Sequence, residues 1–530
     1  MCGIFSYLSN TPLSENFINL LKNESDKLIH RGPDNTRYFF TENIFMGFYR
    51  LAINDLSENG NQPFHMEENN NQYTLICNGE IYNHQELATK YDCSTTSNSD
   101  CEIILHLFKK FGFRETISQL DGVFSCILLH NDIMYIARDP IGVRPLFMGT
   151  KGENLLFASE LKSIHGLSDS IIQFPPGTIW NSNERQFISY YPINKLYEEN
   201  NFMNEEDILK NINNKFTSAV EKRLMSDRPI GCLLSGGLDS SLVAGLLQQR
   251  ISGKLRTFSI GLEGATDLEY ARMVAEHIGS DHTEVIVTEQ DMLDAIPEVI
   301  KAIESYDTTT VRASTPMYLL SQYIKKNTDI IVIYSGEGSD EASGSYLYFH
   351  NAPNEIEFRK ETNRLMCDLS YFDVLRCDRT TAAHSLEVRV PFLDKNFLQY
   401  YMNIEPSMKH PNYGSIEKYL LRKAFDNGLL PNQVLWRTKE AFSDGVSHKE
   451  NSWYRIIQDK VDQLYNNEQF LEKKSMYTHN SPMIKESLYY RDLFHSYYPQ
   501  RDTIIPYYWL PKWNGDIQEP SARILHLSKV

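Results

Sequence analysis

The sequence lacks several features that would place a protein in a membrane, outside the cell or around zinc. None of its apolar runs reaches the roughly 18 residues that a membrane-spanning helix needs. The first residues have no basic stretch and no long apolar core, so they do not form a signal peptide. The eight cysteines contain no Cys-x-x-Cys pair and no zinc-like spacing. We therefore expect a soluble, reduced, cytoplasmic protein that binds no membrane.

Positive charge is also scarce. The chain has 52 lysines and arginines against 69 aspartates and glutamates, which gives a net charge of −17. A nucleic-acid-binding protein normally presents a basic face, so this balance argues against nucleic acid as a partner. A phosphate site must then be a local basic pocket, and Lys or Arg near glycine-rich loops becomes informative.

Length and composition favour two packed domains. A domain usually has about 100–200 residues, and 530 residues with 41% hydrophobic and 12% aromatic content are ample for more than one core. The stretch 185–215 is polar and charged, as is typical of a linker that runs into the start of a helix. We expect one domain at residues 2–185 and a second at 205–530.

The second residue is a cysteine. Removal of Met1 would leave Cys2 with both a thiol and a free α-amine. An α-amine titrates near about 7.7–8.0, so it can act as the base for its own side chain, and such a nucleophile needs no catalytic histidine. Taken alone, a cysteine here can be an accident of position.

Four further segments of this region place polar residues at breaks between expected strands and helices. They are His30–Asp34, Tyr49–Asn54, Leu75–Asn83 and Asn98–Glu102. Read separately, Ser99 and Asp100 are ordinary helix caps, and Asn78-Gly79 is an ordinary turn. Their combination with Cys2 favours a shared site.

Together these motifs resemble a class II glutamine amidotransferase domain. The resemblance rests on Cys2-Gly3-Ile4, Arg31–Asp34, Arg50-Leu51, Asn78–Glu80, Ser99-Asp100 and Ala137–Phe147. It implies an N-terminal-nucleophile hydrolase fold, a four-layer αββα sandwich. It also implies that Cys2 attacks the side-chain amide of glutamine, with Asn78 and the Gly79 N–H as the oxyanion hole.

The same resemblance implies how glutamine is held. Arg50 would bind the α-carboxylate, because a guanidinium matches carboxylate geometry. Asp100, with Glu80, would hold the α-amine. The other glutamine contacts would come from Leu51, Ala52, Ile53 and Asn54. Because glutamine is a zwitterion, its pocket needs one basic residue for the α-carboxylate and one acidic residue for the α-amine, and the residues named here supply both.

In the second region, one stretch joins a glycine turn to the start of a helix. Ile230–Leu234 is typical of a buried strand, Ser235-Gly236-Gly237 of a turn, and Asp239 opens a helix with Ser240 and Ser241. Glycines let backbone N–H groups approach an oxyanion, and the helix dipole adds roughly half a positive charge. The Walker A spacing is absent. The stretch predicts a site for pyrophosphate and magnesium, unless its glycines only fit an ordinary bend.

Strand candidates alternate with helical stretches through this region, which predicts an α/β fold with a parallel sheet and helices on both faces. Strands are expected at 230–234, 255–262, 283–288 and 329–334, and helices near 240–250, 268–279, 291–303 and 315–327. Ligands bind such sheets at the carboxyl ends of the strands. Three loops follow strands at that edge: Ser235–Asp239, Gly261–Asp267 and Ser335–Glu341.

Charged residues in other loops are weaker candidates. The Ser335–Glu341 loop is too acidic to bind phosphate directly; it suits magnesium or an ammonium group, or is simply solvated. Arg312 stands shortly before a helix expected to open near Pro316, and Lys439 stands in a loop rich in turn residues. Both are ordinary solvated side chains unless a second argument supports them.

A resemblance that covers nearly the whole chain supplies that argument. The sequence resembles the family of glutamine-hydrolysing asparagine synthetases, whose second domain is of the ATP-pyrophosphatase type. The matching segments are Ser235–Ser241, Arg312–Pro316, Ser335–Glu341, Arg379–His384, Val390–Asp394 and Lys439–Gly445. Tyr508–Trp513 and Pro520–Arg523 resemble the eukaryotic branch, and no catalytic motif position is substituted.

This resemblance implies ATP as a substrate, with Mg²⁺. The implied nucleotide contacts are Leu233, Ser235, Gly236, Gly237, Asp239, Ser240, Ile260, Ser335 and Gly336, and the implied magnesium ligands are Asp239 and Asp340. Lys439 and Arg312 would contact the phosphates. Glu337 would promote adenylate formation or deprotonate incoming ammonium.

The implied reaction couples two steps. Glutamine gives ammonia and glutamate through a thioester on Cys2, while ATP adenylates the β-carboxylate of aspartate and releases pyrophosphate. Ammonia, sheltered between the domains, then displaces AMP to give asparagine. The alternatives are a related synthetase for a different acid and a non-catalytic homologue; a β-lactam-forming synthetase would not need Cys2. The family suggests a homodimer.

Overall fold

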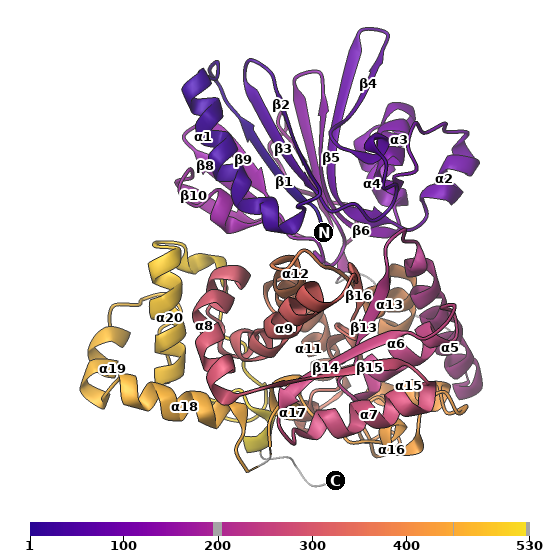
Figure 1. The fold of residues 1–530 in the computed structure, drawn as a ribbon, viewed down its shortest axis with the longest axis vertical. Helices are drawn as coiled ribbons and strands as arrows, with labels where there is room; N and C mark the ends of the chain where they lie inside the picture. The colour runs from indigo at the N-terminus through magenta and orange to yellow at the C-terminus, as the bar shows by residue number, and fades with distance from the viewer. Residues whose placement is uncertain (194–203, 449, 526–530) are drawn as a thin grey trace. The chain divides into compact units, whose positions relative to one another are not determined.

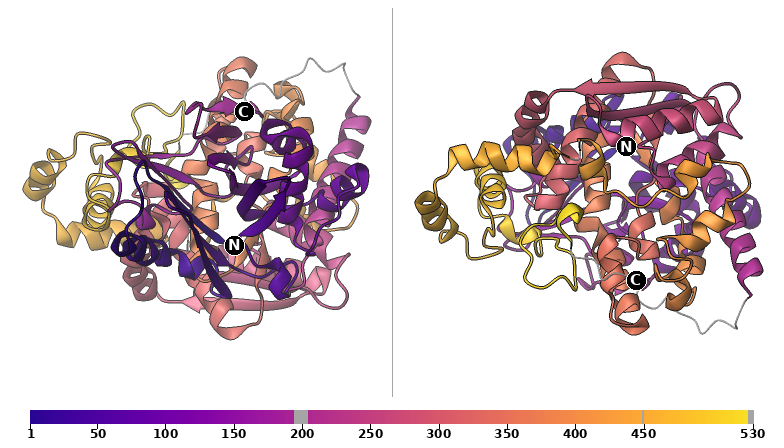
Figure 2. Two further views of the ribbon diagram at one scale, coloured as in Figure 1. Left: turned by 90° about the horizontal axis from the view of Figure 1, so that it is seen from above. Right: turned by 90° about the horizontal axis from the view of Figure 1, so that it is seen from below.

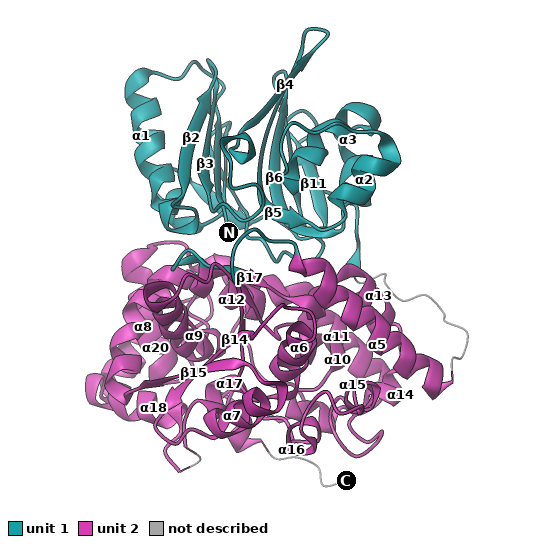
Figure 3. Cartoon of the chain, turned by 45° about the vertical axis from the view of Figure 1, so that its right-hand side comes forward, with its two compact units in different colours: residues 1–193, 225–229, 382–387 teal, residues 194–224, 230–381, 388–530 magenta. Residues whose placement is uncertain are grey.

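The structure is a computed structural model that describes residues 1–193, 204–448 and 450–525. The chain divides into two compact units (Figure 3). The first unit contains residues 1–193 together with two short later segments, 225–229 and 382–387, and the second contains the remainder. Part of the expected linker, residues 194–203, lies outside the described residues.

The first unit is built on two six-stranded antiparallel sheets (Figure 1). Their orders are β10-β8-β9-β1-β3-β2 and β12-β11-β7-β6-β5-β4. The strands are β1 (Gly3–Leu8), β2 (Asn35–Phe40), β3 (Ile44–Arg50), β4 (Phe64–Glu68), β5 (Asn71–Ile81), β6 (Gly122–His130), β7 (Ile133–Arg138), β8 (Phe147–Lys151), β9 (Asn154–Ala158), β10 (Ser170–Gln173), β11 (Thr178–Asn181) and β12 (Ile188–Ser189).

Helices cover the outer faces of these sheets. Helix α1 (Glu15–Ser25) lies against the β1–β3 sheet, and α2 (His84–Tyr91), α3 (Ile103–Phe111) and α4 (Phe113–Gln119) lie against the other (Figure 1). Because successive side chains of a strand point to opposite faces, β5 is buried on both. Leu75 and Cys77 pack with the helices, while Ile76 faces the core between the sheets. The predicted αββα sandwich is confirmed.

The second unit contains a five-stranded sheet of order β15-β14-β13-β16-β17. Its strands are β13 (Ile230–Leu233), β14 (Arg256–Leu262), β15 (Asp281–Val287), β16 (Val332–Tyr334) and β17 (Glu387–Arg389). The first four pair in parallel, as predicted. Strand β13 lies between β14 and β16, so the loops that follow these three strands meet at one edge of the sheet.

Helices surround this sheet and extend beyond it (Figures 1 and 2). The longer ones are α5 (Glu205–Glu221), α6 (Leu238–Gln248), α7 (Thr266–Ile278), α8 (Glu289–Ile303), α9 (Thr308–Asn327), α11 (Glu355–Asp368), α12 (Asp373–Ala382), α13 (Lys395–Met402), α18 (Trp453–Leu464), α19 (Asn467–Lys474) and α20 (Lys485–Tyr497). The shorter ones are α10 (Ser339–Ser343), α14 (Pro406–Lys409), α15 (Tyr419–Ala424), α16 (Asn432–Leu435) and α17 (Phe442–Gly445). Helices α18–α20 form one side of the unit in every view.

Helix α9 differs from the prediction, because it begins at Thr308 and not near Pro316. Asp307 caps its start by accepting a hydrogen bond from the Thr310 N–H at 2.9 Å. Pro316 inside the helix has no N–H to donate to the carbonyl four residues earlier. That carbonyl, of Arg312, instead accepts from the Trp453 indole N–H at 3.2 Å. Tertiary contact therefore stabilises a helical turn that the proline pattern argued against.

Two further findings concern the chain as a whole. All eight cysteines are free thiols. Among the described helices, none combines the length and the apolar character that crossing a membrane requires.

Two leucines on helices of the second unit give a matched test of this packing. Leu242 in α6 is fully buried, whereas Leu471 in α19 is 65% exposed. Leu242→Ala should lower the free energy of unfolding by about 2–5 kcal/mol, since it removes buried methyl groups and leaves a cavity. Leu471→Ala should change it by less than about 0.5 kcal/mol. Urea unfolding followed by tryptophan fluorescence measures both, and equal midpoints would contradict the packing described.

Candidate active sites

The first candidate site lies around Cys2, immediately before β1. The Cys2 thiol donates to the Leu51 carbonyl at 3.8 Å. The Arg31 guanidinium holds the Cys2 carbonyl at 2.9 Å and pairs with Glu160 at 2.6 Å. Arg31 and Glu160 are both fully buried. The arginine of the Arg31–Asp34 motif thus fixes the backbone of the candidate nucleophile.

Asn78 is fully buried on β5 and is unusual in its hydrogen bonding. Neither the nitrogen nor the oxygen of its side-chain amide has a hydrogen-bond partner among the described residues. Asn78 lies two residues beyond Ile76, so both side chains point to the same face of β5. That face borders the core between the sheets, against which Cys2 also packs. A buried polar group without a partner calls for an explanation such as a ligand.

Gly79 follows Asn78 where β5 and β6 approach closely. A Cβ added at Gly79 would lie 2.3 Å from the Val123 carbonyl oxygen, so no other residue fits this backbone. The glycine therefore keeps the strand in place next to Asn78.

Two acidic residues predicted to share a site are linked through Asn54. The Asn54 amide donates to Glu80 at 2.5 Å and to Asp100 at 3.4 Å. The other Asp100 oxygen accepts from the Ile81 N–H at 2.6 Å. Burial raises the pKa of Asp100. The structure thus brings Glu80, Asp100 and Asn54 together.

Arg50, at the end of β3, is 5% exposed. Its guanidinium donates to the Ser57 carbonyl at 2.9 Å, to the Asn61 side chain at 2.7 Å and to the Asp55 carbonyl. The predicted glutamine-binding arginine is therefore bonded to the turn that follows it, residues 54–61.

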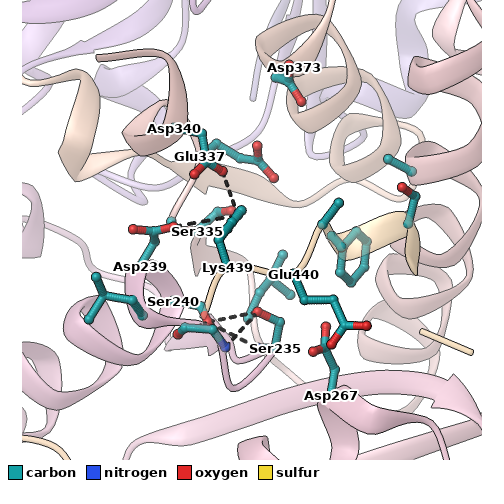
Figure 4. A pocket seen from close by; sticks show the side chains of 18 of the residues that line it. Ser235, Asp239, Ser240, Asp267, Ser335, Glu337, Asp340, Asp373, Lys439 and Glu440 are labelled. Atoms are coloured by element: carbon teal, nitrogen blue, oxygen red, sulfur yellow. Dashed lines mark hydrogen bonds and ion pairs between the residues drawn. The ribbon is translucent and has the colours of Figure 1, made fainter. Parts of the chain in front are cut away.

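The second candidate site is a pocket at the carboxyl edge of the second sheet (Figure 4). We call it the strand-end pocket. The loops after β13 and β16 contribute, together with β14 itself, Asp267 at the start of α7 and the segment 437–443. Of the predicted nucleotide and catalytic residues, it is lined by Leu233, Ser235, Gly237, Asp239, Ser240, Ile260, Ser335, Gly336, Glu337, Asp340 and Lys439. Gly236 is not among the lining residues, but it shapes the loop.

Two glycines set the geometry of the pocket loops. Gly236 has φ +73°, which favours glycine, and a Cβ there would lie 2.4 Å from the backbone nitrogen of Ala271. A Cβ on Gly336 would lie 2.8 Å from the backbone nitrogen of Ser240. The Ser235 and Ser240 hydroxyls are 3.0 Å apart. Close packing against α7 therefore requires a glycine at 236, and close packing against the N-terminus of α6 requires a glycine at 336.

Two lysines and two carboxylates cross-pair in this pocket. Lys418 contacts Asp239 at 2.6 Å and Asp340 at 2.7 Å. Lys439 contacts Asp340 at 2.7 Å and Asp239 at 4.0 Å. We call these four residues the Lys–Asp cluster. Asp239 also accepts from Ser339, and Asp340 from Ser345, each at 2.7 Å.

Electrostatics in the Lys–Asp cluster keep its charges in place. Although burial favours the neutral forms, Asp340 and Asp239 hold the pKa of Lys439 well above its ordinary value. In the same way Lys418 and Lys439 hold the pKa of Asp340 well below its ordinary value, against the effect of burial. The cluster therefore presents fixed charges of both signs beside the Ser235–Ser240 loop.

Glu337 lies next to this cluster and has a basic partner of its own. Arg376 of α12 donates to Glu337 and to Asp373, each at 2.7 Å. Burial raises the pKa of Glu337, and the Arg376 charge opposes that rise. Arg376 and Asp373 both line the strand-end pocket.

Arg312 is not part of the strand-end pocket, so the structure does not support its predicted contact with phosphates. Its guanidinium is 3% exposed and pairs with Glu486 and Glu519, with contacts of 2.5 Å to each. The physical reason is the early start of α9: Thr309, Ala313 and Met317 face the pocket, and Arg312 points to a different side of the helix.

Lys418, Asp373 and Arg376 were not predicted. Lys418 is 179 residues from Asp239 in sequence, and it has a left-handed backbone with φ +58° just before α15. No pattern around it marks a functional lysine, since a single lysine in a polar loop is usually solvated. Its burial at 4% exposure is a property of the fold.

Asp239 and Asp340, the two carboxylates expected to hold a divalent cation, contact the same lysine. Their carboxylates converge on the same lysine amine, so they lie close enough to share an ion. Mg²⁺ in nucleotide sites is usually held by one or two carboxylates together with phosphate oxygens and water. Two carboxylates beside a glycine turn at the start of a helix are compatible with this pattern.

The fold and the two sites define a class: an N-terminal glutamine amidotransferase domain joined to an α/β synthetase domain. The family model described as "Glutamine amidotransferase domain" matches residues 1–189, and the one described as "Asparagine synthase" matches 211–369 and 354–513. Together these models match well over half of the chain.

Curated relatives match over almost the full length. A probable asparagine synthetase [glutamine-hydrolyzing] of Acanthamoeba polyphaga mimivirus is 44% identical, covering 99% of this chain and 100% of that protein. The asparagine synthetases [glutamine-hydrolyzing] of Cricetulus griseus and Homo sapiens are 43% and 42% identical, each covering 99% of this chain and 98% of theirs. The chain belongs to the family of glutamine-hydrolysing asparagine synthetases.

The environment of Cys2 leads to a prediction about pH. In the chain that keeps Met1, burial raises the pKa of the Cys2 thiol to about 11. A raised pKa keeps the thiol protonated at neutral pH, and only the thiolate is nucleophilic. Alkylation of Cys2 by iodoacetamide, followed by peptide mass spectrometry, should speed up about tenfold per pH unit from pH 7 to 10. A rate that levels off by about pH 9, as for an ordinary thiol, would contradict this.

Proposed function

We propose that the chain converts ATP, L-aspartate, L-glutamine and water into AMP, pyrophosphate, L-asparagine and L-glutamate. Hydrolysis of glutamine supplies ammonia, and ATP activates the aspartate β-carboxylate as β-aspartyl-AMP. Ammonia then attacks the activated carbonyl carbon, and AMP leaves. The observation that carries the proposal is the Lys–Asp cluster beside the Ser235–Ser240 loop.

In the amidotransferase half, Cys2 acts as the nucleophile after Met1 is removed, and its own α-amine takes the thiol proton. The Asn78 amide and the Gly79 N–H stabilise the oxyanion that forms on the glutamine carbonyl oxygen. The unpartnered, fully buried Asn78 amide supports this role. Collapse of the tetrahedral species releases ammonia and leaves a thioester, which water hydrolyses to glutamate.

Charged groups at the other end of glutamine hold the substrate. Glu80 and Asp100 accept from its α-ammonium group, and Arg50 binds its α-carboxylate. Since Arg50 is bonded to the 54–61 turn, a bound carboxylate would exchange with at least one of those bonds. Backbone atoms of Leu51, Ala52 and Ile53 complete the pocket.

In the synthetase half, the N–H groups of the Ser235–Ser240 loop and the start of α6 bind the pyrophosphate part of ATP. Leu233 and Ile260 contact the adenine, and Ser335 and Gly336 lie by the nucleotide. Lys418 and Lys439 exchange carboxylate partners for phosphate oxygens and neutralise charge as pyrophosphate departs. The paired cluster supports this, since the pKa of Lys439 is raised and both lysines already contact Asp239 of this loop.

Mg²⁺ would be held by Asp239 and Asp340, and when bound it neutralises phosphate charge. Glu337 has a raised pKa and lies beside the cluster, which suits a base that takes a proton from the incoming ammonium. Arg376 fixes the position of the Glu337 carboxylate through its 2.7 Å contact.

Replacement of Cys2, the proposed nucleophile, distinguishes glutamine hydrolysis from the synthetase reaction. Cys2→Ala should abolish glutamine-dependent asparagine synthesis and leave synthesis from ammonium chloride within about twofold of wild type, because the α/β half needs only ammonia. Cys93→Ala, which removes another partly exposed thiol of the first unit, is the control and should leave both activities intact. Equal loss of both activities in Cys2→Ala would refute this division of labour.

Replacement of Lys418 tests the cluster. Lys418→Met should lower ammonia-dependent kcat by about 10²–10³-fold, the range for loss of one preorganised charge that stabilises a transition state. Lys423→Met, on the neighbouring α15 and 44% exposed, removes the same charge outside the pocket. Synthesis rates with saturating ATP and aspartate distinguish the two. A Lys418→Met enzyme as fast as Lys423→Met would argue against a role for Lys418 in phosphate binding.

A further inference from the structure

The segment that carries Lys439 is a thin wall of the strand-end pocket. Residues 437–441 line that pocket on one side. On their other side they line an open hollow, whose lining also includes Ala522 and Arg523. The position of the Lys439 amine therefore depends on what packs against the outside of this wall.

Arg523 makes the contacts on that outer side. Its guanidinium pairs with Glu440 at 3.0 Å and donates to the backbone carbonyls of Asp444 at 2.8 Å and His448 at 2.9 Å. The neighbouring Ser521 hydroxyl donates to the Asp444 carboxylate at 3.2 Å. One side chain thus holds three points of the segment 440–448.

From Glu440, a series of polar contacts continues inward to the Ser235–Ser240 loop. Glu440 pairs with Arg437 at 2.8 Å, and Arg437 also pairs with Asp267 at 3.0 Å. Arg437 donates to the Gly236 carbonyl at 3.2 Å, and its guanidinium lies 3.9 Å from the centre of the Tyr270 ring. An unbroken series of polar contacts therefore joins Arg523 to the turn expected to bind pyrophosphate.

The segment that bears Arg523 has its own anchor in Arg312. Glu519 accepts from Arg312 at 2.5 Å and from Gln458 at 2.6 Å, and it also accepts from the Ser521 N–H at 2.9 Å. Arg312 is held by the fully buried Glu486. A rigid support of this kind is what keeps a catalytic group within a fraction of an ångström of its working position.

We propose that Glu519–Ile524 is a brace that holds the Lys439 segment in place, with Arg523 as its positioning residue and the Arg312–Glu519 pair as its anchor. Arg312 then serves the synthetase reaction from outside the pocket. The proposal rests on the proposed function of Lys439, because a brace matters for catalysis only if that lysine acts on ATP.

The test compares Arg523→Ala and Glu519→Gln with Arg272→Ala. Arg272 pairs with Glu284 through two hydrogen bonds on an exposed face of α7, so its loss controls for removing an arginine–carboxylate pair. Arg523→Ala should lower ammonia-dependent kcat/KM for ATP about ten- to hundredfold, since a small misplacement of a catalytic group has an effect of this size. Glu519→Gln should act in the same direction, and Arg272→Ala should not.

Three readouts separate positioning from a general loss of structure. Glutaminase activity of Arg523→Ala should equal that of wild type. Millimolar guanidinium should restore part of its synthetase activity by occupying the site beside Glu440. Amide hydrogen exchange within 437–448 should become faster in Arg523→Ala and stay unchanged in Arg272→Ala.

Wild-type synthesis by Arg523→Ala, or exchange in 437–448 equal to wild type, would overturn the brace. A wild-type enzyme that makes no asparagine would instead overturn the proposed function, and the exchange measurement would still decide whether Arg523 holds the segment.

Discussion

The cross-pairing of Lys418 and Lys439 with Asp239 and Asp340 is the interaction on which the synthetase half depends. Four charged side chains that are only 2–20% exposed are tolerated when each has an opposite partner at short range. The pairing needs the ends of β13 and β16 side by side, a glycine at 336 and a strained backbone at Lys418. The charges can therefore pair only if the strands are parallel neighbours and the loops after them are in close contact.

The candidate binding groups of the two units differ in whether they already have polar partners. In the second, the charges satisfy one another, and a phosphate would have to replace a carboxylate as partner of each lysine. In the first, the Asn78 amide has no partner among the described residues and is fully buried. An amide already free of competing bonds can bind an oxyanion without first breaking one, which is the advantage of a preorganised site.

Local patterns were sufficient to predict much of this. The Ile230–Ser241 stretch carries its strand, turn and helix start within a dozen residues, and Asn78–Glu80 and Ser99-Asp100 likewise stand at element boundaries. Alternating strands and helices predicted the parallel sheet. Lys418 could not be predicted, because its role arises from burial against residues distant in sequence. Arg312 was expected before a helix and lies inside one. The Trp453 indole donates to the Arg312 carbonyl, which Pro316 leaves without its helical donor, and no local rule anticipates this contact.

In the proposed reaction, nitrogen from the glutamine amide is transferred to aspartate while ATP is cleaved to AMP. The most direct measurement supplies glutamine labelled with ¹⁵N in its side-chain amide, together with aspartate and ATP, and analyses all products. The expected result is ¹⁵N in the asparagine amide, with one AMP and one pyrophosphate formed for each asparagine. ADP in place of AMP, or nucleotide cleavage that does not depend on aspartate, would contradict it.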